Sequence, residues 1–152
     1  RGRPMMAATG NVALVRRLYE AVWNDGDPAV ADELIAPREV HHPHGGTEPG
    51  GPEAQKQAAR RFRRAFPDNR LTIELVVDGG ELIAVRWRIE GTHAATGRPI
   101  TDYTGVNIFR ISDGKIVEIW DTRDDLGLYA QVGLIPPRSE LAPQLVGSAP
   151  QQ

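Results

Sequence analysis

Residues 104–133 read TGVNIFRISDGKIVEIWDTRDDLGLYAQVG. Two runs rich in β-branched residues flank the dipeptide Asp113-Gly114, and the second run continues directly into a helical pattern. Glycine supplies the positive φ that tight hairpin turns require, so this stretch predicts two antiparallel strands followed by a short helix. The rest of the fold can be built outward from this hairpin.

The register of the hairpin would bring two polar side chains to one face. If the turn is a three-residue loop, Asn107 lies opposite Ile119 and diagonal to Asp121, about 7–8 Å away. Phe109 and Val117 are expected on the same face, because side chains alternate along a strand. A carboxylate and an amide among apolar side chains predict the wall of a binding pocket.

Composition and charge exclude several classes of function. The 152 residues favour one domain with a real core, and a net charge of −2 gives no general attraction for nucleic acid or anionic membranes. The chain has no cysteine, which excludes disulfides, thiolate nucleophiles and cysteine zinc sites. No apolar run approaches the roughly 20 residues of a membrane span. No signal peptide is evident either, so we expect a cytoplasmic protein.

Helical and strand patterns occupy separate parts of the chain. Helices are expected over residues 11–24, 29–36, 53–66 and 124–132, a loop or short strand over 37–52, and strands over 71–77, 81–93, 100–111 and 115–123. This order predicts an α+β fold in which three helices pack on one face of a curled antiparallel sheet. A cavity is expected where the inner face of the sheet meets the first helix.

The two ends of the chain have few core-forming residues. Residues 1–10 are expected to be a disordered arm or a cloning remnant, and residues 11–135 to form the single domain. Residues 136–152 are rich in Pro, Ser and Gln, and we expect a disordered tail.

Several short motifs lie in a characteristic order along the chain. They are VRRLYEAVWNDGD (15–27), RRAFPD (63–68), VRW (85–87), GTH (91–93), FRISDGKIVEIW (109–120) and DDLGLYAQVG (124–133). Together they resemble the SnoaL-like polyketide cyclases, a branch of the NTF2-like cone fold, over roughly residues 11–135. The hairpin motif is common across NTF2-like proteins, whereas the last motif is more specific to the SnoaL-like branch.

The resemblance implies roles for individual residues. In the cyclases, the acid/base is an aspartate at the position of Asp121, and it faces a histidine at the position of Asn107. In the ketosteroid isomerase branch of the same fold, a tyrosine of the first helix aligns with Tyr19 and a catalytic aspartate before proline aligns with His42. Some SnoaL-like proteins resemble the cyclases but act as hydroxylase components, and asparagine at position 107 keeps that alternative open.

The chemistry of these residues leaves alternatives open. An apolar wall around the Asp121 carboxylate would suit a general base, whereas an ion pair with Arg123 would give it a structural role. His41, His42 and His44 lie in a Pro/Gly-rich loop without a carboxylate at ligand spacing, so no metal is predicted. Six residues are expected to line the pocket and contact a flat aromatic ligand: Tyr19, Trp23, Trp87, Tyr103, Phe109 and Ile119.

Combined with the resemblance, these features predict an enzyme that acts on a polycyclic aromatic polyketide, of the anthracycline type, without a cofactor. Asp121 would remove a proton from a carbon between carbonyl groups, and Asn107, Tyr19 or His42 would stabilise the enolate before an aldol-type ring closure. One alternative is a hydroxylase component that works with oxygen and a reductase partner. Another is a non-catalytic binding module.

Two further expectations concern neighbouring functions and partners. An epoxide hydrolase of this fold would need an Asp-Arg-Asp array, and Asp121, Arg123 and Asp124 are too close in sequence to provide one convincingly. A homodimer is expected, because an outer sheet face would otherwise expose a large apolar patch. The residues expected there are Val106, Ile108, Ile116 and Trp120.

Overall fold

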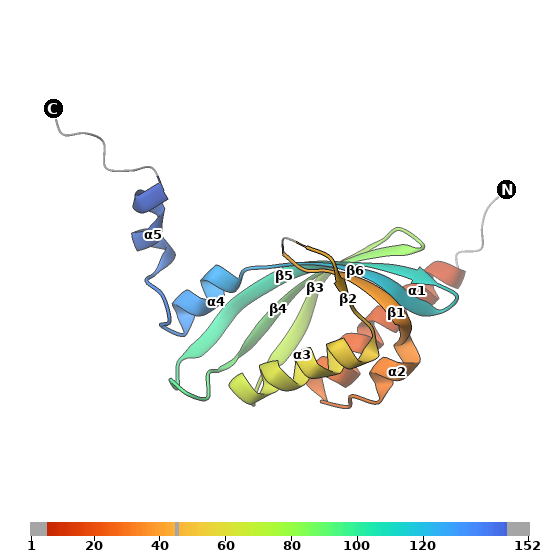
Figure 1. Ribbon diagram of the computed structural model, residues 1–152, viewed down its shortest axis with the longest axis horizontal. Coiled ribbons are helices and arrows are strands. Elements are labelled where there is room, and N and C mark those ends of the chain that lie inside the picture. Colours follow the sequence, from red (N-terminus) through yellow and green to blue (C-terminus); the bar gives the residue numbers. More distant parts are fainter. Residues whose placement is uncertain (1–5, 45, 146–152) are drawn as a thin grey trace.

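One curled sheet with helices against its inner face makes up the body of the protein (Figure 1). The computed structural model describes residues 6–44 and 46–145. Its helices are α1 (Met6–Arg17), the π-helical segment η1 (Leu18–Asn24), α2 (Val30–Leu34), α3 (Pro52–Ala65), α4 (Asp125–Gln131) and α5 (Arg138–Leu145). Its strands are β1 (Ile35–His42), β2 (Glu48–Pro49), β3 (Arg70–Asp78), β4 (Leu82–Thr92), β5 (Pro99–Ser112) and β6 (Lys115–Arg123). The predicted α+β cone is therefore confirmed.

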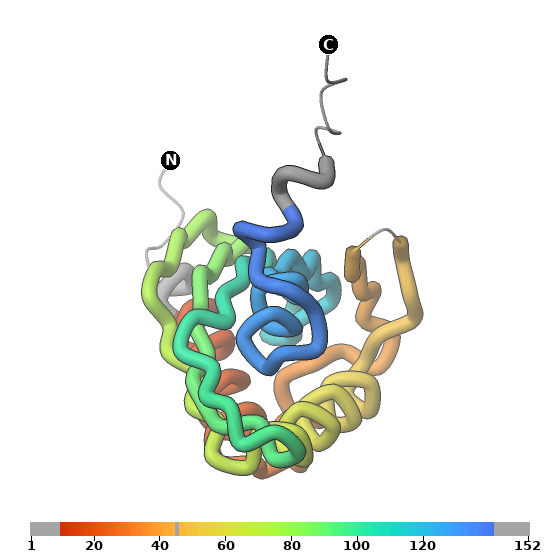
Figure 2. Tube along the Cα trace, turned by 90° about the vertical axis from the view of Figure 1, so that its left-hand side faces the viewer, coloured from red at the N-terminus to blue at the C-terminus, as the bar shows by residue number. Residues whose placement is uncertain are grey.

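The N-terminal helices fill the concave side of the sheet (Figure 2). The predicted first helix begins at Met6 and changes from α to π geometry at Leu18, and its apolar stripe of Val15, Leu18 and Val22 is buried. Helix α3 spans the open side of the cone and begins with Pro52, a residue suited to the first helical turn. Among the described helices, none is both long enough and apolar enough to cross a membrane.

The sheet is larger than the sequence predicted, because β1 begins at Ile35, inside the predicted helix over residues 29–36, and β2 forms within the predicted loop over residues 37–52. The strand order is β2-β1-β6-β5-β4-β3. Strand β1 runs parallel to β6, and the other neighbouring pairs are antiparallel. In this register His41 pairs with Ile119 and His42 with Trp120. The two histidines therefore face opposite sides of the sheet.

The β5–β6 hairpin has a different register from the predicted one. Asp113 and Gly114 have φ of 51° and 72°, as a two-residue type I′ turn requires, so the predicted three-residue loop is wrong. A bulge at Val117 then shifts the pairing by one residue. Asn107 consequently lies directly opposite Asp121 rather than opposite Ile119, and the two side chains still share the inner face.

The ends of the chain differ from expectation. The first helix includes residues 6–10, and residues 138–145 form α5, which extends away from the body of the protein (Figure 1). Backbone bonds from Glu140 and Leu141 to the Pro137 carbonyl begin α5, and Arg138 lies 2.5 Å from the Asp124 carboxylate. Residues 1–5 and 146–152, which belong to the predicted arm and tail, lie outside the described residues.

The outer face of the sheet carries exposed apolar side chains. Val106 and Ile108 of β5 are 41% and 38% exposed, and Leu75 and Val77 of β3 are 58% and 56% exposed. Ile116, which was expected on this face, is fully buried because the bulge turns it toward the core. Three strands of the sheet thus share an apolar surface, with Trp120 of β6 beside Ile108.

We predict that this outer face joins two copies of the chain. Burying a patch of several hundred Å² would stabilise a homodimer through the hydrophobic effect. Sedimentation should give twice the 16.7 kDa chain mass at micromolar concentration, and Ile108→Lys should shift it to the monomer. Leu126→Lys, at an exposed apolar residue of α4, is the matched control and should leave the dimer intact. A wild-type monomer would contradict the prediction.

Candidate functional site

A cavity of about 500 Å³ lies between the inner face of the sheet and segments η1, α3 and α4. This volume is in the range of sites that enclose small organic molecules. The cavity is lined by all six side chains that the sequence placed at the pocket: Tyr19, Trp23, Trp87, Tyr103, Phe109 and Ile119. Their part in ligand binding stays a prediction.

One wall of the cavity is made of aromatic rings. Phe62 of α3 stacks on Tyr103 with ring centroids 5.8 Å apart and an interplanar angle of 15°, and on Phe66 at 4.8 Å. Trp87 meets the edge of Tyr103 at 5.3 Å. Phe62 and Phe66 line the cavity as well, although the sequence did not assign them to the pocket. Flat surfaces of this kind are suited to the faces of fused aromatic rings.

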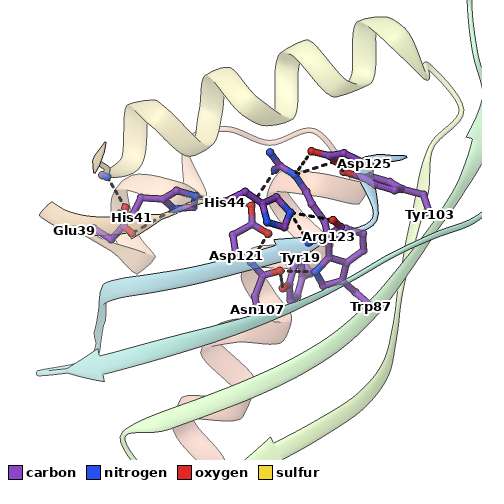
Figure 3. Close-up of polar contacts among 11 residues, drawn as sticks. Tyr19, Glu39, His41, His44, Trp87, Tyr103, Asn107, Asp121, Arg123 and Asp125 are labelled. Carbon is purple, nitrogen blue, oxygen red and sulfur yellow. Dashed lines mark hydrogen bonds and ion pairs between the residues drawn. The ribbon is translucent and has the colours of Figure 1, made fainter. Parts of the chain in front are cut away.

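Asn107 is held from both ends of its amide (Figure 3). Its Oδ1 accepts hydrogen bonds from Tyr19 Oη at 3.0 Å and from Trp87 Nε1, and its Nδ2 donates to Asp121 Oδ1 at 3.2 Å. Gly105 makes room for the indole, because a Cβ there would lie 2.3 Å from the Trp87 ring. Asn107 therefore orients the Asp121 carboxylate.

Tyr19 is a fixed donor in this arrangement. Burial and then the negative charge of Asp121 raise the pKa of Tyr19 well above its ordinary value, so the hydroxyl keeps its proton. That proton is directed to Asn107, as is the Trp87 N–H. Both donors are therefore used by Asn107, although the sequence predicted that Tyr19 would stabilise an enolate.

We predict that Asn107→Ala lowers both stability and turnover moderately. Two buried donors, on Tyr19 and Trp87, would lose their acceptor at a cost of about 1–3 kcal/mol each. The carboxylate of Asp121 would lose one of its orienting bonds but keep its ion pair, so the loss of turnover should be smaller than for Asp121→Asn. Thermal unfolding and steady-state kinetics measure the two effects. An unchanged melting temperature would contradict this account.

Asp121 faces the cavity and is also part of an ion-pair chain. Its side chain is 8% exposed, and its Oδ2 lies 2.9 Å from Arg123 Nη1. Arg123 Nε in turn lies 3.2 Å from Asp125 Oδ1, and Tyr103 Oη donates to that oxygen at 2.7 Å. The apolar surroundings expected for Asp121 are therefore only part of its environment. The ion pair with Arg123, which the sequence left open as an alternative, is present as well.

These ion pairs form an Asp-Arg-Asp array, which was not expected from Asp121, Arg123 and Asp124. The third member is Asp125, whereas Asp124 caps α4 by accepting from the backbone N–H of Gly127 at 2.9 Å. Burial alone would lower the pKa of Arg123, but Asp121, Tyr103 and Asp125 raise it above its ordinary value. The guanidinium therefore stays charged between the two carboxylates.

His41 is the histidine at the cavity. Its Nε2 lies 3.9 Å from Asp121 Oδ2, and its Nδ1 lies 3.7 Å from Glu39 Oε1 on the same strand. The approach of its Nδ1 to the Glu39 carboxylate is the largest influence on its pKa and raises it, while burial opposes this. The negative charges of Glu39 and Asp121 add to the increase and Arg123 counteracts it, and the net pKa of His41 is raised.

His42, the predicted catalytic histidine, lies on the outer face, so its assignment to the pocket is wrong. Its ring stacks on Trp120 at 5.2 Å and 12°, and its Nε2 lies 2.8 Å from Glu118 Oε1. The pairing of β1 with β6 decides this, because alternation gives His41 the inner face. His44 lies near the Arg123 backbone, with Nε2 3.0 Å from its carbonyl oxygen. The described residues contain no group of three or more His, Asp or Glu suited to a metal.

The fold and the cavity define a class of protein: an α+β cone that encloses a small-molecule pocket with a carboxylate and an imidazole on its wall. The model of the SnoaL-like polyketide cyclase family matches residues 13–132. The chain belongs to this family. A search of curated proteins found no match.

Solved structures give the same relationship. IdmH of Streptomyces antibioticus, a candidate polyketide cyclase, is 34% identical, with a TM-score of 0.71 over 80% of this chain and 97% of that one. A candidate polyketide cyclase from Bacillus cereus is 31% identical, with a TM-score of 0.74 over 88% and 87%. AclR of Streptomyces galilaeus, a candidate hydroxylase, is 24% identical, with a TM-score of 0.75 over 85% and 99%, and this likeness shows the fold alone.

Proposed function

We propose that the protein catalyses an acid/base reaction at an activated carbon of a polycyclic aromatic polyketide, an aldol-type ring closure of antibiotic biosynthesis. The observation that carries the proposal is the pair of Asp121 and His41, 3.9 Å apart on the wall of an aromatic cavity. Membership of the polyketide cyclase family supports it, as does the likeness to IdmH.

Asp121 is the base in this proposal. Asn107 and Arg123 each hold one of its oxygens, which fixes the carboxylate relative to the cavity. A carbon between two carbonyl groups is acidic enough for a carboxylate to deprotonate, and the resulting enolate attacks a second carbonyl of the same molecule. A ligand fixed against the aromatic wall would present one such carbon to Asp121.

His41 is the acid. Its raised pKa favours the imidazolium, which can donate a proton to the alkoxide that forms when the new C–C bond closes. After ring closure Asp121 holds the substrate proton and His41 is neutral. The 3.9 Å between Oδ2 and Nε2 then allows that proton to return to His41, directly after a small shift or through one water. The cycle consumes no cofactor.

The test is conversion of a polycyclic polyketide intermediate that carries an uncyclised 1,3-dicarbonyl side chain. Mass spectrometry distinguishes the outcomes, because ring closure keeps the mass or loses one water, whereas hydroxylation adds one oxygen. Conversion with unchanged mass or loss of water supports the proposal. Addition of one oxygen atom, with a reductase present, would contradict ring closure. It would instead support a role as a hydroxylase component, in which the same carbanion reacts with O₂. Binding without conversion under any condition would support a binding module.

A further inference from the structure

We propose that Glu39 is a positioning residue for His41, a carboxylate buried beneath the cavity wall that holds the imidazole with Nδ1–H inward and Nε2–H toward the cavity. The inference rests on the proposed role of His41 as the acid. It concerns a residue that does not line the cavity and that the sequence did not single out. Three observations support it: the burial of Glu39, the backbone that holds it, and the charges that surround His41.

Glu39 is an ionisable side chain in the interior with one oxygen unsatisfied. It is 2% exposed, and its Oε2 accepts a hydrogen bond from the backbone N–H of Gly51 at 2.7 Å. Its Oε1 has no hydrogen-bond partner among the described residues, and it lies 3.7 Å from His41 Nδ1. A buried carboxylate is costly unless a charge or donor compensates it, and the imidazolium of His41 supplies both.

The loop before α3 is shaped around this carboxylate. The Gly50 N–H donates to the Glu39 backbone carbonyl at 2.9 Å, and a Cβ at position 50 would lie 1.8 Å from Glu39 Oε2. Gly51 has φ of 103°, a conformation that favours glycine. The two glycines let the backbone approach the carboxylate closely. The backbone of the run Pro49-Gly50-Gly51-Pro52 thus packs against Glu39 and holds its side chain in place.

Different charged groups lie near the two ring nitrogens of His41. Asp121 and Arg123 come from β6 on the cavity side, where Asp121 Oδ2 is 3.9 Å from Nε2. Glu48 of β2 pairs with His41 across the strands and is exposed to solvent. Glu39 is the group at Nδ1. Because a carboxylate accepts and never donates when ionised, Glu39 requires a proton on Nδ1 and leaves Nε2 for the ligand.

The experiment is an NMR titration of the histidine side chains in the full chain, with Glu39→Gln compared to wild type. The glutamine amide can keep the Gly51 bond through its oxygen and turn its NH₂ toward Nδ1, which favours the neutral ring. We expect a lower pKa of His41 in Glu39→Gln. The alkaline limb of the pH–kcat profile should move to lower pH, with KM unchanged.

The matched control is Glu118→Gln. It removes the carboxylate 2.8 Å from His42 on the outer face and should leave the titration of His41 and turnover unchanged. Gly50→Ala is the second variant, because it keeps the charge of Glu39 but displaces it, and it should lower the pKa of His41 in the same direction. Gly50→Ala also tests the role of Glu39 if Glu39→Gln does not fold.

An unchanged pKa of His41 in folded Glu39→Gln, or in Gly50→Ala if the first variant is unfolded, would overturn the inference. The titration needs no substrate, so it distinguishes this failure from failure of the proposed function. A shifted pKa in a protein that converts no polyketide would leave the Glu39–His41 pair standing and remove only its role in ring closure. A shift that is equal in Glu118→Gln would also overturn the inference, because it would reflect net charge alone.

Discussion

Asp121→Asn is expected to reduce turnover strongly while ligand binding changes little. A general base contributes about 10²–10⁴-fold to the rate, and the loss should be at least this large. The amide matches the carboxylate in shape but cannot take up a proton from carbon. The fold should survive, because Arg123 keeps its ion pair with Asp125 and the Asn107 side chain keeps an oxygen acceptor opposite it. The loss should therefore appear in kcat.

The measurement is turnover of the polyketide intermediate, with and without a reductase, beside a binding titration on each variant. Asp102→Asn, at an exposed position on β5 that does not line the cavity, removes one charge and is the matched control. If Asp121→Asn turns over at the wild-type rate, the base lies elsewhere and His41 becomes the first candidate. Loss of binding together with turnover would instead assign Asp121 to ligand recognition.

His41→Gln is expected to give the second-largest loss of turnover, whereas His42→Gln should leave turnover near the wild-type rate. The two histidines are neighbours in sequence but face opposite sides of the sheet, so the pair isolates the effect of the cavity. Removal of a general acid costs about 10²–10⁴-fold when the proton must reach the alkoxide from water. Steady-state kinetics on both variants provides the test, and equal losses would contradict the assignment.

The pH dependence of His41 has a definite sign. Because its folded pKa is raised above the unfolded value, the imidazolium stabilises the fold fully below the unfolded pKa of about 6.5. That stabilisation is lost as pH rises through the folded pKa. Turnover that needs the imidazolium should fall on the same alkaline side. In His41→Gln this limb should disappear from the pH–kcat profile, and its persistence would assign the limb to another group.

Local sequence patterns were enough to predict most of the architecture. Helical spacing of apolar residues, alternating strands and Asp113-Gly114 each depend on residues close together in the chain, and the helices before residue 132, the β5–β6 hairpin and the α+β class followed from them. Strand β2 and helix α5 were not predicted. The presence of Asn107 and Asp121 on the inner face was predicted correctly although their register was not. The error in the turn length and the unforeseen bulge at Val117 cancelled for that face.

Periodicity along single elements was sufficient to predict the class of fold and six of the residues that line the cavity, although Phe62 and Phe66 of the aromatic wall were missed. Which histidine faces the cavity could not be predicted in this way. The face of His41 depends on the parallel pairing of β1 with β6, a contact between distant segments that no local pattern encodes. Glu39 was missed for the same reason, since its burial depends on Gly50 and Gly51 folding back over β1. Pairing between distant segments therefore assembled the proposed acid, its base and its supporting carboxylate.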